Sequence, residues 1–573
     1  MLISRLTFLK FLVASAFLLL AGCGDADKAA DQYDVLIRNG TVYDGTGAQG
    51  QRADVGVRGD RIVAIGDLSG AEAAAVIDAE GKAVSPGFIN MLSWATDSLI
   101  IDGRGLSDTA QGVTLEVFGE GWSMGPLADH TKADYQKKIS ATPQPYDVTW
   151  TGFGEYLEML ESKGISPNVA SFVGATTVRI NHVGYADRAP TADELAAMKA
   201  EVAKAMQEGA MGLGTSLIYA PAFYAETDEL IALASVAGQY GGRYISHMRN
   251  EGSQIMTSLE ELITIAREAG LPAEIYHLKA AGKDNWAKLD DVIARVEAAR
   301  AEGLDIGADM YSYTAGATGL DAAMPPWVQE GTHEDWAERL KNPAIRKRLQ
   351  VEMTTPSDEW ENLMLAAGAE GVLLPYFQNP ELKKYTGMRL SDVAKAMDKT
   401  PEEAAMDLVI ADGTRVSAIY FLMSEDNVKK KIRQPWVAFG SDAEAVDPDV
   451  ARAFGGKHPR TYGNVARLLG HYVRDEKVIP LAEAIYRLTG LPAERLKVRG
   501  RGYIKVGDFA DLVVFDPMTI TDHATFNDPH QLATGVSHVF INGVQVIRDG
   551  THTGATPGRV VRGPGWTGWA DQQ

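Results

Sequence analysis

The chain has 573 residues, a length that predicts one large domain together with a smaller one. Its apolar content of 45% and charged content of 23% are ordinary for a soluble globular protein. The formal net charge of −21 argues against nucleic acid or an anionic membrane surface as a partner, because both favour a basic face.

The amino terminus predicts export and lipidation. Arg5 and Lys10 precede an apolar run over residues 11–20, which is too short to remain as a spanning helix and is typical of a secretory signal. Two small residues and then Cys23, the only cysteine, follow this run, a context that resembles a bacterial lipoprotein signal. We therefore expect a signal peptide over 1–23, a lipid on Cys23 and a tether over 24–32. A chance cysteine after an ordinary signal is the alternative.

This interpretation also predicts where the protein resides. A lipid on Cys23 would hold it on the periplasmic side of the cell envelope, with the lipid as its only link to a membrane. Gly24 stands where an inner-membrane retention signal would usually place aspartate, which favours the outer membrane. With one cysteine, no disulfide within the chain is possible.

Both ends of the remaining chain have a sequence pattern typical of β-hairpins. Short apolar runs broken by Gly and Asp occur over residues 33–84 and again over 500–549. We expect these two segments to form one small β-sandwich domain.

The middle of the chain, residues 85–499, alternates short apolar strands with helical segments and predicts a (β/α)8 barrel of the TIM type. Residues 312–435 are too long for a plain loop and predict a helical insertion between strands 7 and 8 that covers the mouth of the barrel. The eight expected strands are Gly87–Leu92, Thr114–Gly119, Asn168–Val173, Met211–Leu217, Tyr244–His247, Glu274–His277, Asp305–Tyr311 and Trp436–Asp442.

Four side chains at the carboxyl ends of these strands predict a catalytic metal site, because active residues of such barrels lie there. His247 and His277 end neighbouring strands, Glu120 follows the second strand and Asp442 ends the last. Two histidines with a glutamate are an established zinc set, and Asp442 would take a proton from the activated water and pass it to the leaving group. Structural histidines, a surface glutamate and a helix-capping Asp442 are the alternatives.

Several motifs in this order resemble the N-acyl-D-amino-acid deacylases (D-aminoacylases) of the amidohydrolase superfamily, from about Tyr33 to about Asp549. They are Ser85-Pro86-Gly87-Phe88-Ile89, Tyr244-Ile245-Ser246-His247-Met248-Arg249-Asn250-Glu251, His277-Leu278-Lys279, Asp309-Met310-Tyr311-Ser312-Tyr313-Thr314-Ala315-Gly316, Gly440-Ser441-Asp442 and His458-Pro459-Arg460.

The resemblance implies the same fold, with metal ligands at His247 and His277 and the acid–base at Asp442. It also implies substrate-binding roles for three further side chains, Lys279, Tyr219 and Tyr311.

Two positions depart from the superfamily pattern. Leu92 and Trp94 stand in place of its first-strand His-x-His, and neither binds metal. Glu120-Gly121 stands where the deacylases offer a cysteine ligand, so Glu120 replaces it only if the loop shifts by about a residue. We therefore expect one zinc per chain, held by Glu120, His247 and His277, rather than a two-metal site.

The leading hypothesis is a zinc-dependent hydrolase that cleaves the amide bond of N-acyl-D-amino acids or related small amides, such as D-residue dipeptides. A cyclic-amide hydrolase of the dihydropyrimidinase type is the alternative among enzymes. The alternative that is not an enzyme is a non-catalytic binding lipoprotein, and the missing first-strand histidines favour it.

Overall fold

The computed structural model describes residues 32–572. The predicted signal segment 1–23 with Cys23, and residues 24–31 of the predicted tether, lie outside the described residues. Gln32, which we expected to end the tether, begins the first strand. In the described part of the chain, no helix combines the length and the hydropathy that crossing a bilayer requires.

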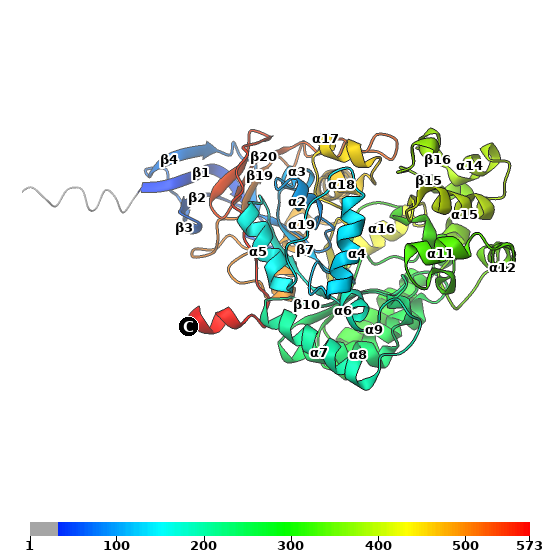
Figure 1. Ribbon diagram of the computed structural model, residues 1–573. Coiled ribbons are helices and arrows are strands. Elements are labelled where there is room, and N and C mark those ends of the chain that lie inside the picture. Colours follow the sequence, from blue (N-terminus) through cyan, green and yellow to red (C-terminus); the bar gives the residue numbers. More distant parts are fainter. Residues whose placement is uncertain (1–31, 573) are drawn as a thin grey trace, which may run out of the picture.

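A parallel barrel occupies the centre of the molecule (Figure 1). A three-stranded and a six-stranded sheet meet at two seams. At one seam, β8 and β9 are consecutive parts of one strand interrupted at Phe172. At the other, Met91 N–H donates to Phe439 O and Asp442 N–H to Leu92 O. The barrel strands are β6 (Phe88–Asn90), β7 (Val113–Phe118), β8 (Asn168–Ser171), β9 (Val173–Gly174), β10 (Gly212–Ser216), β11 (Arg243–His247), β12 (Ala273–Ile275), β13 (Ile306–Met310) and β18 (Val437–Phe439).

All eight predicted strands are therefore present, and the predicted TIM-like barrel is confirmed. Apolar side chains such as Leu115, Phe172 and Ile245 fill its interior. The helices around it are α5 (Phe153–Lys163), α6 (Ala175–His182), α7 (Ala192–Gln207), α8 (Thr227–Gln239), α9 (Ile255–Ala269), α10 (Lys288–Ala301), α16 (Glu425–Ile432), α18 (Arg460–Arg467), α19 (Leu481–Leu488) and α20 (Gly490–Leu496). Helix α7 begins where the sequence indicates, because Thr191 and Glu194 form a capping box.

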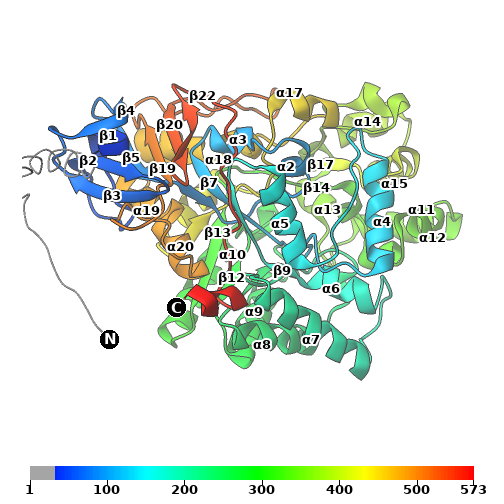
Figure 2. The same cartoon turned by 60° about the vertical axis from the view of Figure 1, so that its left-hand side comes forward.

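Strands from both ends of the chain join in a separate β domain beside the barrel, in blue and orange-red in Figure 2. We expected a sandwich of two sheets, whereas hydrogen bonds link all nine strands into one sheet. A register shift between Ile37 and Gly40 lets β1 pair with β4 along one part and with β5 along the next. The strands are β1 (Gln32–Val42), β2 (Gln51–Arg58), β3 (Arg61–Gly66), β4 (Glu72–Asp78), β5 (Ala83–Pro86), β19 (Leu512–Phe515), β20 (Val536–Ile541), β21 (Val544–Arg548) and β22 (Thr551–His552).

Between β13 and β18 the chain builds a layer with its own hydrophobic core, on the opposite side of the barrel from the β domain (Figures 1 and 2). We expected helices here, and the layer also contains a four-stranded antiparallel sheet in the order β14-β17-β15-β16. Its elements are β14 (Gly316–Gly319), α11 (His333–Arg339), α12 (Pro343–Thr354), α13 (Leu363–Ala367), β15 (Val372–Leu374), β16 (Met388–Arg389), α14 (Leu390–Ala396), α15 (Pro401–Asp412) and β17 (Ser417–Tyr420).

Three short helices and one longer helix lie in the segments that follow the barrel strands β6, β7 and β18. They are α2 (Ser98–Ile101), α3 (Leu106–Thr109), α4 (Asp129–Ser140) and α17 (Pro448–Ala451). Lys137 of α4 forms an ion pair of 2.7 Å with Glu334 of the inserted layer, so α4 and the insertion lie side by side.

Candidate active site

Four predicted site residues lie at the carboxyl ends of barrel strands; Glu120, His247 and His277 are buried, and Asp442 is partly buried. Glu120 follows β7, His247 ends β11, His277 follows β12 and Asp442 follows β18. His277 and Asp442 both adopt positive φ, 34° and 50°, a conformation that L-residues rarely take. Backbone strain of this kind concentrates at functional sites, where the surrounding fold holds it in place.

Glu120, His247 and His277 converge on one point. Glu120 Oε1 lies 2.9 Å from His247 Nδ1 and 2.9 Å from His277 Nε2. One ligand atom from each residue lies within 4.8 Å of the other two. Two imidazoles and one carboxylate are a donor set that zinc prefers, and water is largely excluded around them. The residues present therefore fit a single zinc ion.

A second carboxylate supports the two imidazoles from behind. Glu251 lies 3.4 Å from His247 Nε2 and 3.2 Å from His277 Nδ1, on the ring nitrogens that face away from Glu120. Lys279 Nζ donates to Glu251 at 2.6 Å and lies 2.7 Å from His277 Nδ1. Carboxylates placed behind metal-binding histidines orient the rings and raise their basicity.

Trp94 donates a hydrogen bond to the second carboxylate oxygen of Glu120. Its indole Nε1–H donates to Glu120 Oε2 at 2.9 Å. The side chain that replaces the second histidine of the superfamily motif therefore fixes the rotamer of Glu120. Leu92, at the first histidine position, is fully buried in the barrel interior.

Burial and neighbouring charges shift the pKa values of the three candidate metal ligands. Burial would raise the pKa of Glu120, but the charges of His277 and His247 and their hydrogen bonds hold it far below its usual value. Burial lowers the pKa of His247. Burial and Lys279 also act to lower the pKa of His277, yet Glu251 and Glu120 outweigh them and raise it to about 10. The centre thus stabilises positive charge beside Glu120, as a metal-binding site must.

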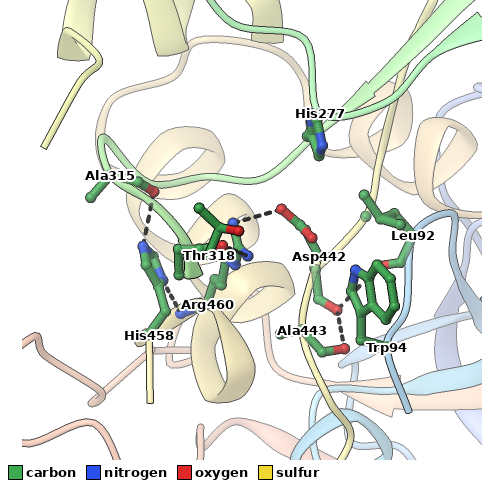
Figure 3. Close-up of polar contacts among 12 residues, drawn as sticks. Leu92, Trp94, His277, Ala315, Thr318, Asp442, Ala443, His458 and Arg460 are labelled. Carbon is green, nitrogen blue, oxygen red and sulfur yellow. Dashed lines mark hydrogen bonds and ion pairs between the residues drawn. The ribbon is translucent and has the colours of Figure 1, made fainter. Parts of the chain in front are cut away.

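Asp442 faces the same cavity and pairs with a cation. Arg460 Nη1 lies 2.7 Å from its Oδ2 (Figure 3). His458 supports Arg460, since its Nδ1 accepts the Arg460 backbone N–H at 3.0 Å and its Nε2 lies 2.9 Å from Ala315 O. Burial raises the pKa of Asp442 above its ordinary value even though Arg460 acts to lower it. A carboxyl group with a raised pKa is suited to both accepting and returning a proton.

The predicted metal ligands, Asp442 and the three predicted substrate-binding residues line one cavity of about 560 Å³. Tyr219 O–H donates to Thr318 Oγ1 at 2.8 Å. The hydroxyl of Tyr311 is buried and has no hydrogen-bond partner within residues 32–572, and Arg460 stacks on its ring at 4.5 Å. Burial raises the pKa of Tyr311 to about 12, so the group remains a hydrogen-bond donor.

Sequence reasoning assigned no role to Glu251, Arg460 or Trp94. Glu251 follows His247 by four residues in a quoted motif, and Arg460 ends another, so both positions carried a signal. Trp94 was noted only as a residue that binds no metal, and no pattern in the chain indicates its contact with Glu120.

Comparison with known proteins relates this chain to a family of hydrolases. The model of the amidohydrolase family matches residues 75–547. The D-aminoacylase of Alcaligenes xylosoxydans xylosoxydans is 34% identical over 540 residues, which cover 92% of this chain and 97% of that protein.

Two solved structures are similar over almost their whole length. One is a D-aminoacylase, from work on the functional role of its binuclear metal centre that describes one-metal activation and second-metal attenuation. It is 33% identical to this chain with a TM-score of 0.77, and the match covers 92% of this chain and 100% of that one. The other is the N-acyl-D-glutamate deacylase of Bordetella bronchiseptica complexed with zinc and a phosphonate inhibitor that mimics the tetrahedral intermediate, with 29% identity, a TM-score of 0.77, and coverage of 93% and 100%.

Proposed function

Because this chain belongs to the amidohydrolase family, we propose that it is a zinc-dependent hydrolase that cleaves the amide bond of N-acyl-D-amino acids or related small amides, such as D-residue dipeptides. The observation that carries this proposal is the convergence of Glu120, His247 and His277 in the cavity that Asp442 also faces. The relatives support the class of reaction, a metal-dependent hydrolysis of carbon–nitrogen bonds other than peptide bonds.

We propose one zinc per chain, held by Glu120, His247 and His277. When bound, zinc polarises the scissile carbonyl and lowers the pKa of a bound water to about 7. The replacement of the first-strand histidines by Leu92 and Trp94 supports a single ion, since the Trp94 indole occupies the free side of Glu120. The one-metal activation described for a similar D-aminoacylase also supports it.

Asp442 serves as the proton carrier in this proposal. As a carboxylate it accepts the proton of the attacking water, and as a carboxylic acid it returns that proton to the leaving nitrogen. Arg460, at 2.7 Å, stabilises the ionised form between these two steps.

Three further side chains position the substrate. Lys279 and Tyr311 carry donors on the wall of the cavity, and the Tyr311 hydroxyl is free to bind the oxygen that gains negative charge in the transition state. Tyr219 is held through Thr318, and its ring contacts His247 with 5.4 Å between centroids, which supports a substrate-binding role next to the metal site.

The relatives favour this function over a cyclic-amide hydrolase and over a binding lipoprotein without activity. The experiment that separates them measures metal content and hydrolysis of N-acetyl-D-amino acids on the same sample. We expect about one zinc per chain, loss of hydrolysis on chelation and recovery with added zinc. Turnover that persists in metal-free protein would refute the zinc mechanism.

We also propose that the protein is lipid-anchored through Cys23 on the periplasmic side of the outer membrane. The basic and apolar run before Cys23, and Gly24 after it, support this proposal. Mass spectrometry of the amino-terminal peptide from membranes would show a diacylglycerol on Cys23. A soluble mature protein with an unmodified Cys23 would refute it.

A further inference from the structure

The cavity is more basic than the protein that surrounds it. Five basic and four acidic residues line it, whereas the whole chain carries a net charge of −21. Cations that no lining carboxylate neutralises would attract an anionic ligand into such a concave site. The basic residues are Lys138, Lys279, Arg415, Lys457 and Arg460.

Three of these cations are paired inside the cavity. Lys279 bonds Glu251 at 2.6 Å, and Arg460 lies 2.7 Å from Asp442. Lys457 bonds Glu444 at 2.5 Å. Since the acidic partners also line the cavity, these pairs leave little net charge for a ligand.

Lys138 and Arg415 are the two that remain. Lys138 lies on α4 with an exposed side chain, and its Nζ makes no hydrogen bond or ion pair with any residue that the structure describes. Enclosure lowers its pKa, the charge of Asp134 one turn earlier opposes this, and the charge of Arg415 adds to it. Lys138 and Arg415 line the same cavity, so an anion placed between them is attracted by both.

Arg415 belongs to the insertion and lines the same cavity as Lys138. Its Nε donates to Asp321, at 2.7 Å and outside the cavity lining, while Nη2 makes a long contact of 3.4 Å with Thr318. The outer face of the guanidinium thus remains available to a ligand. A neighbouring cavity of about 510 Å³ is also lined by Arg415, so there is room for a group beyond it.

The distance to the metal site suits a small substrate. The Arg415 guanidinium lies 5.0 Å from the centre of the Tyr219 ring, and that ring lies 5.4 Å from the ring of His247. One phenol ring therefore separates Arg415 from a metal ligand. One residue spans about 3.8 Å, so an amide held at the metal places a group one or two residues away beside Arg415.

We propose that Lys138 and Arg415 bind a second anionic group of the substrate, beyond the α-carboxylate that every N-acyl amino acid carries. This inference rests on the proposed function. The second carboxylate has two possible sources, an acidic side chain on the D-residue or an acidic acyl arm. Both bring the same chemistry to the two cations.

The test compares matched substrates on the zinc-loaded protein. N-acetyl-D-glutamate against N-acetyl-D-glutamine probes the side chain, and N-succinyl-D-leucine against N-butyryl-D-leucine probes the acyl arm. We expect kcat/KM to favour the acidic member of at least one pair by about tenfold. The pair that shows the preference identifies the source of the anion.

Variants locate the preference at the two cations. Lys138→Gln and Arg415→Gln should each lower the acidic-to-neutral ratio by about threefold, and Arg415→Lys should lower it less. Lys137→Gln is the matched control, because Lys137 bonds Glu334 and does not line the cavity. Lys138 has no bonded partner, so its variant tests the proposal even if Arg415→Gln fails to fold.

The outcomes separate the two proposals. Hydrolysis of neutral and acidic substrates at equal kcat/KM would overturn this inference and leave the proposed function intact. A preference that survives both Lys138→Gln and Arg415→Gln would also overturn it. No hydrolysis of any substrate by zinc-loaded protein would overturn the proposed function itself.

Discussion

The contact between Trp94 and Glu120 allows a sharp test of the metal site. Trp94 Nε1–H donates to Glu120 Oε2 at 2.9 Å, whereas both histidines contact Oε1. No other hydrogen bond to Oε2 occurs among residues 32–572. Trp94→Phe removes this donor and keeps an aromatic ring in place. We expect zinc affinity to fall about 10- to 100-fold, the range typical for a lost support of a metal ligand.

The magnitude follows from the kind of bond that is lost. A hydrogen bond to a charged group contributes about 1.5–3 kcal/mol, and a tenfold change in a dissociation constant corresponds to about 1.4 kcal/mol. One such bond therefore accounts for the expected change. Glu120 is only 5% exposed, so water cannot readily replace the missing donor.

Competition with a chromophoric chelator would measure the zinc dissociation constant of each variant. Trp122→Phe is the matched control, because Trp122 lines the same cavity and its indole makes no hydrogen bond with Glu120. We expect wild-type zinc affinity in Trp122→Phe. A Trp94→Phe variant that binds zinc as tightly as the wild type would refute the orienting role of Trp94.

Three more predictions follow from the site. Asp442→Asn should keep zinc and lose kcat by about 10²- to 10⁴-fold in steady-state assays; a full rate would exclude the proton-carrier role. Glu251→Gln removes the carboxylate between Lys279 and His277, so zinc affinity should fall about 10- to 100-fold in the chelator assay, and equal affinity would show that the support is unimportant. Asp442 must be ionised to accept a proton, so kcat/KM falls as pH falls through its pKa, which burial raises. Arg460→Gln removes the opposing cation and should move this acid limb to higher pH; an unmoved pH profile would contradict the pairing.

Much of the barrel and its centre was predictable from sequence, and the reason is geometric. Parallel strands in a barrel end at one face, so His247, His277 and Asp442 had to lie near one another once their strands were recognised. The contact of Trp94 with Glu120 was not predictable, because it depends on two side-chain rotamers on neighbouring strands.

In the insertion, the helical character was predictable from the sequence and the short strands were not. Its helices α11, α12 and α15 begin at capping signals such as Thr400 before Pro401, in agreement with the predicted helical character of the insertion. Its strands are two to four residues long, and a run that short carries no readable alternation. The joining of both terminal segments in one β domain was predicted, but their arrangement in a single sheet was not, because the strand order, including the pairing of β5 with β19, leaves no local signal in the sequence.

The same pairing has a consequence for how the protein acquires its structure. Val84 of β5 is aligned with Val514 of β19. The amino-terminal strands of the β domain therefore cannot pair with β19 until nearly the whole polypeptide has been synthesised. The chain must lose the entropy of closing a loop of that length before the β5–β19 contact can stabilise the fold. Folds that are rich in such long-range contacts form slowly. Until then one edge of β5 is unpaired, and an unpaired strand edge can pair with other chains and promote aggregation.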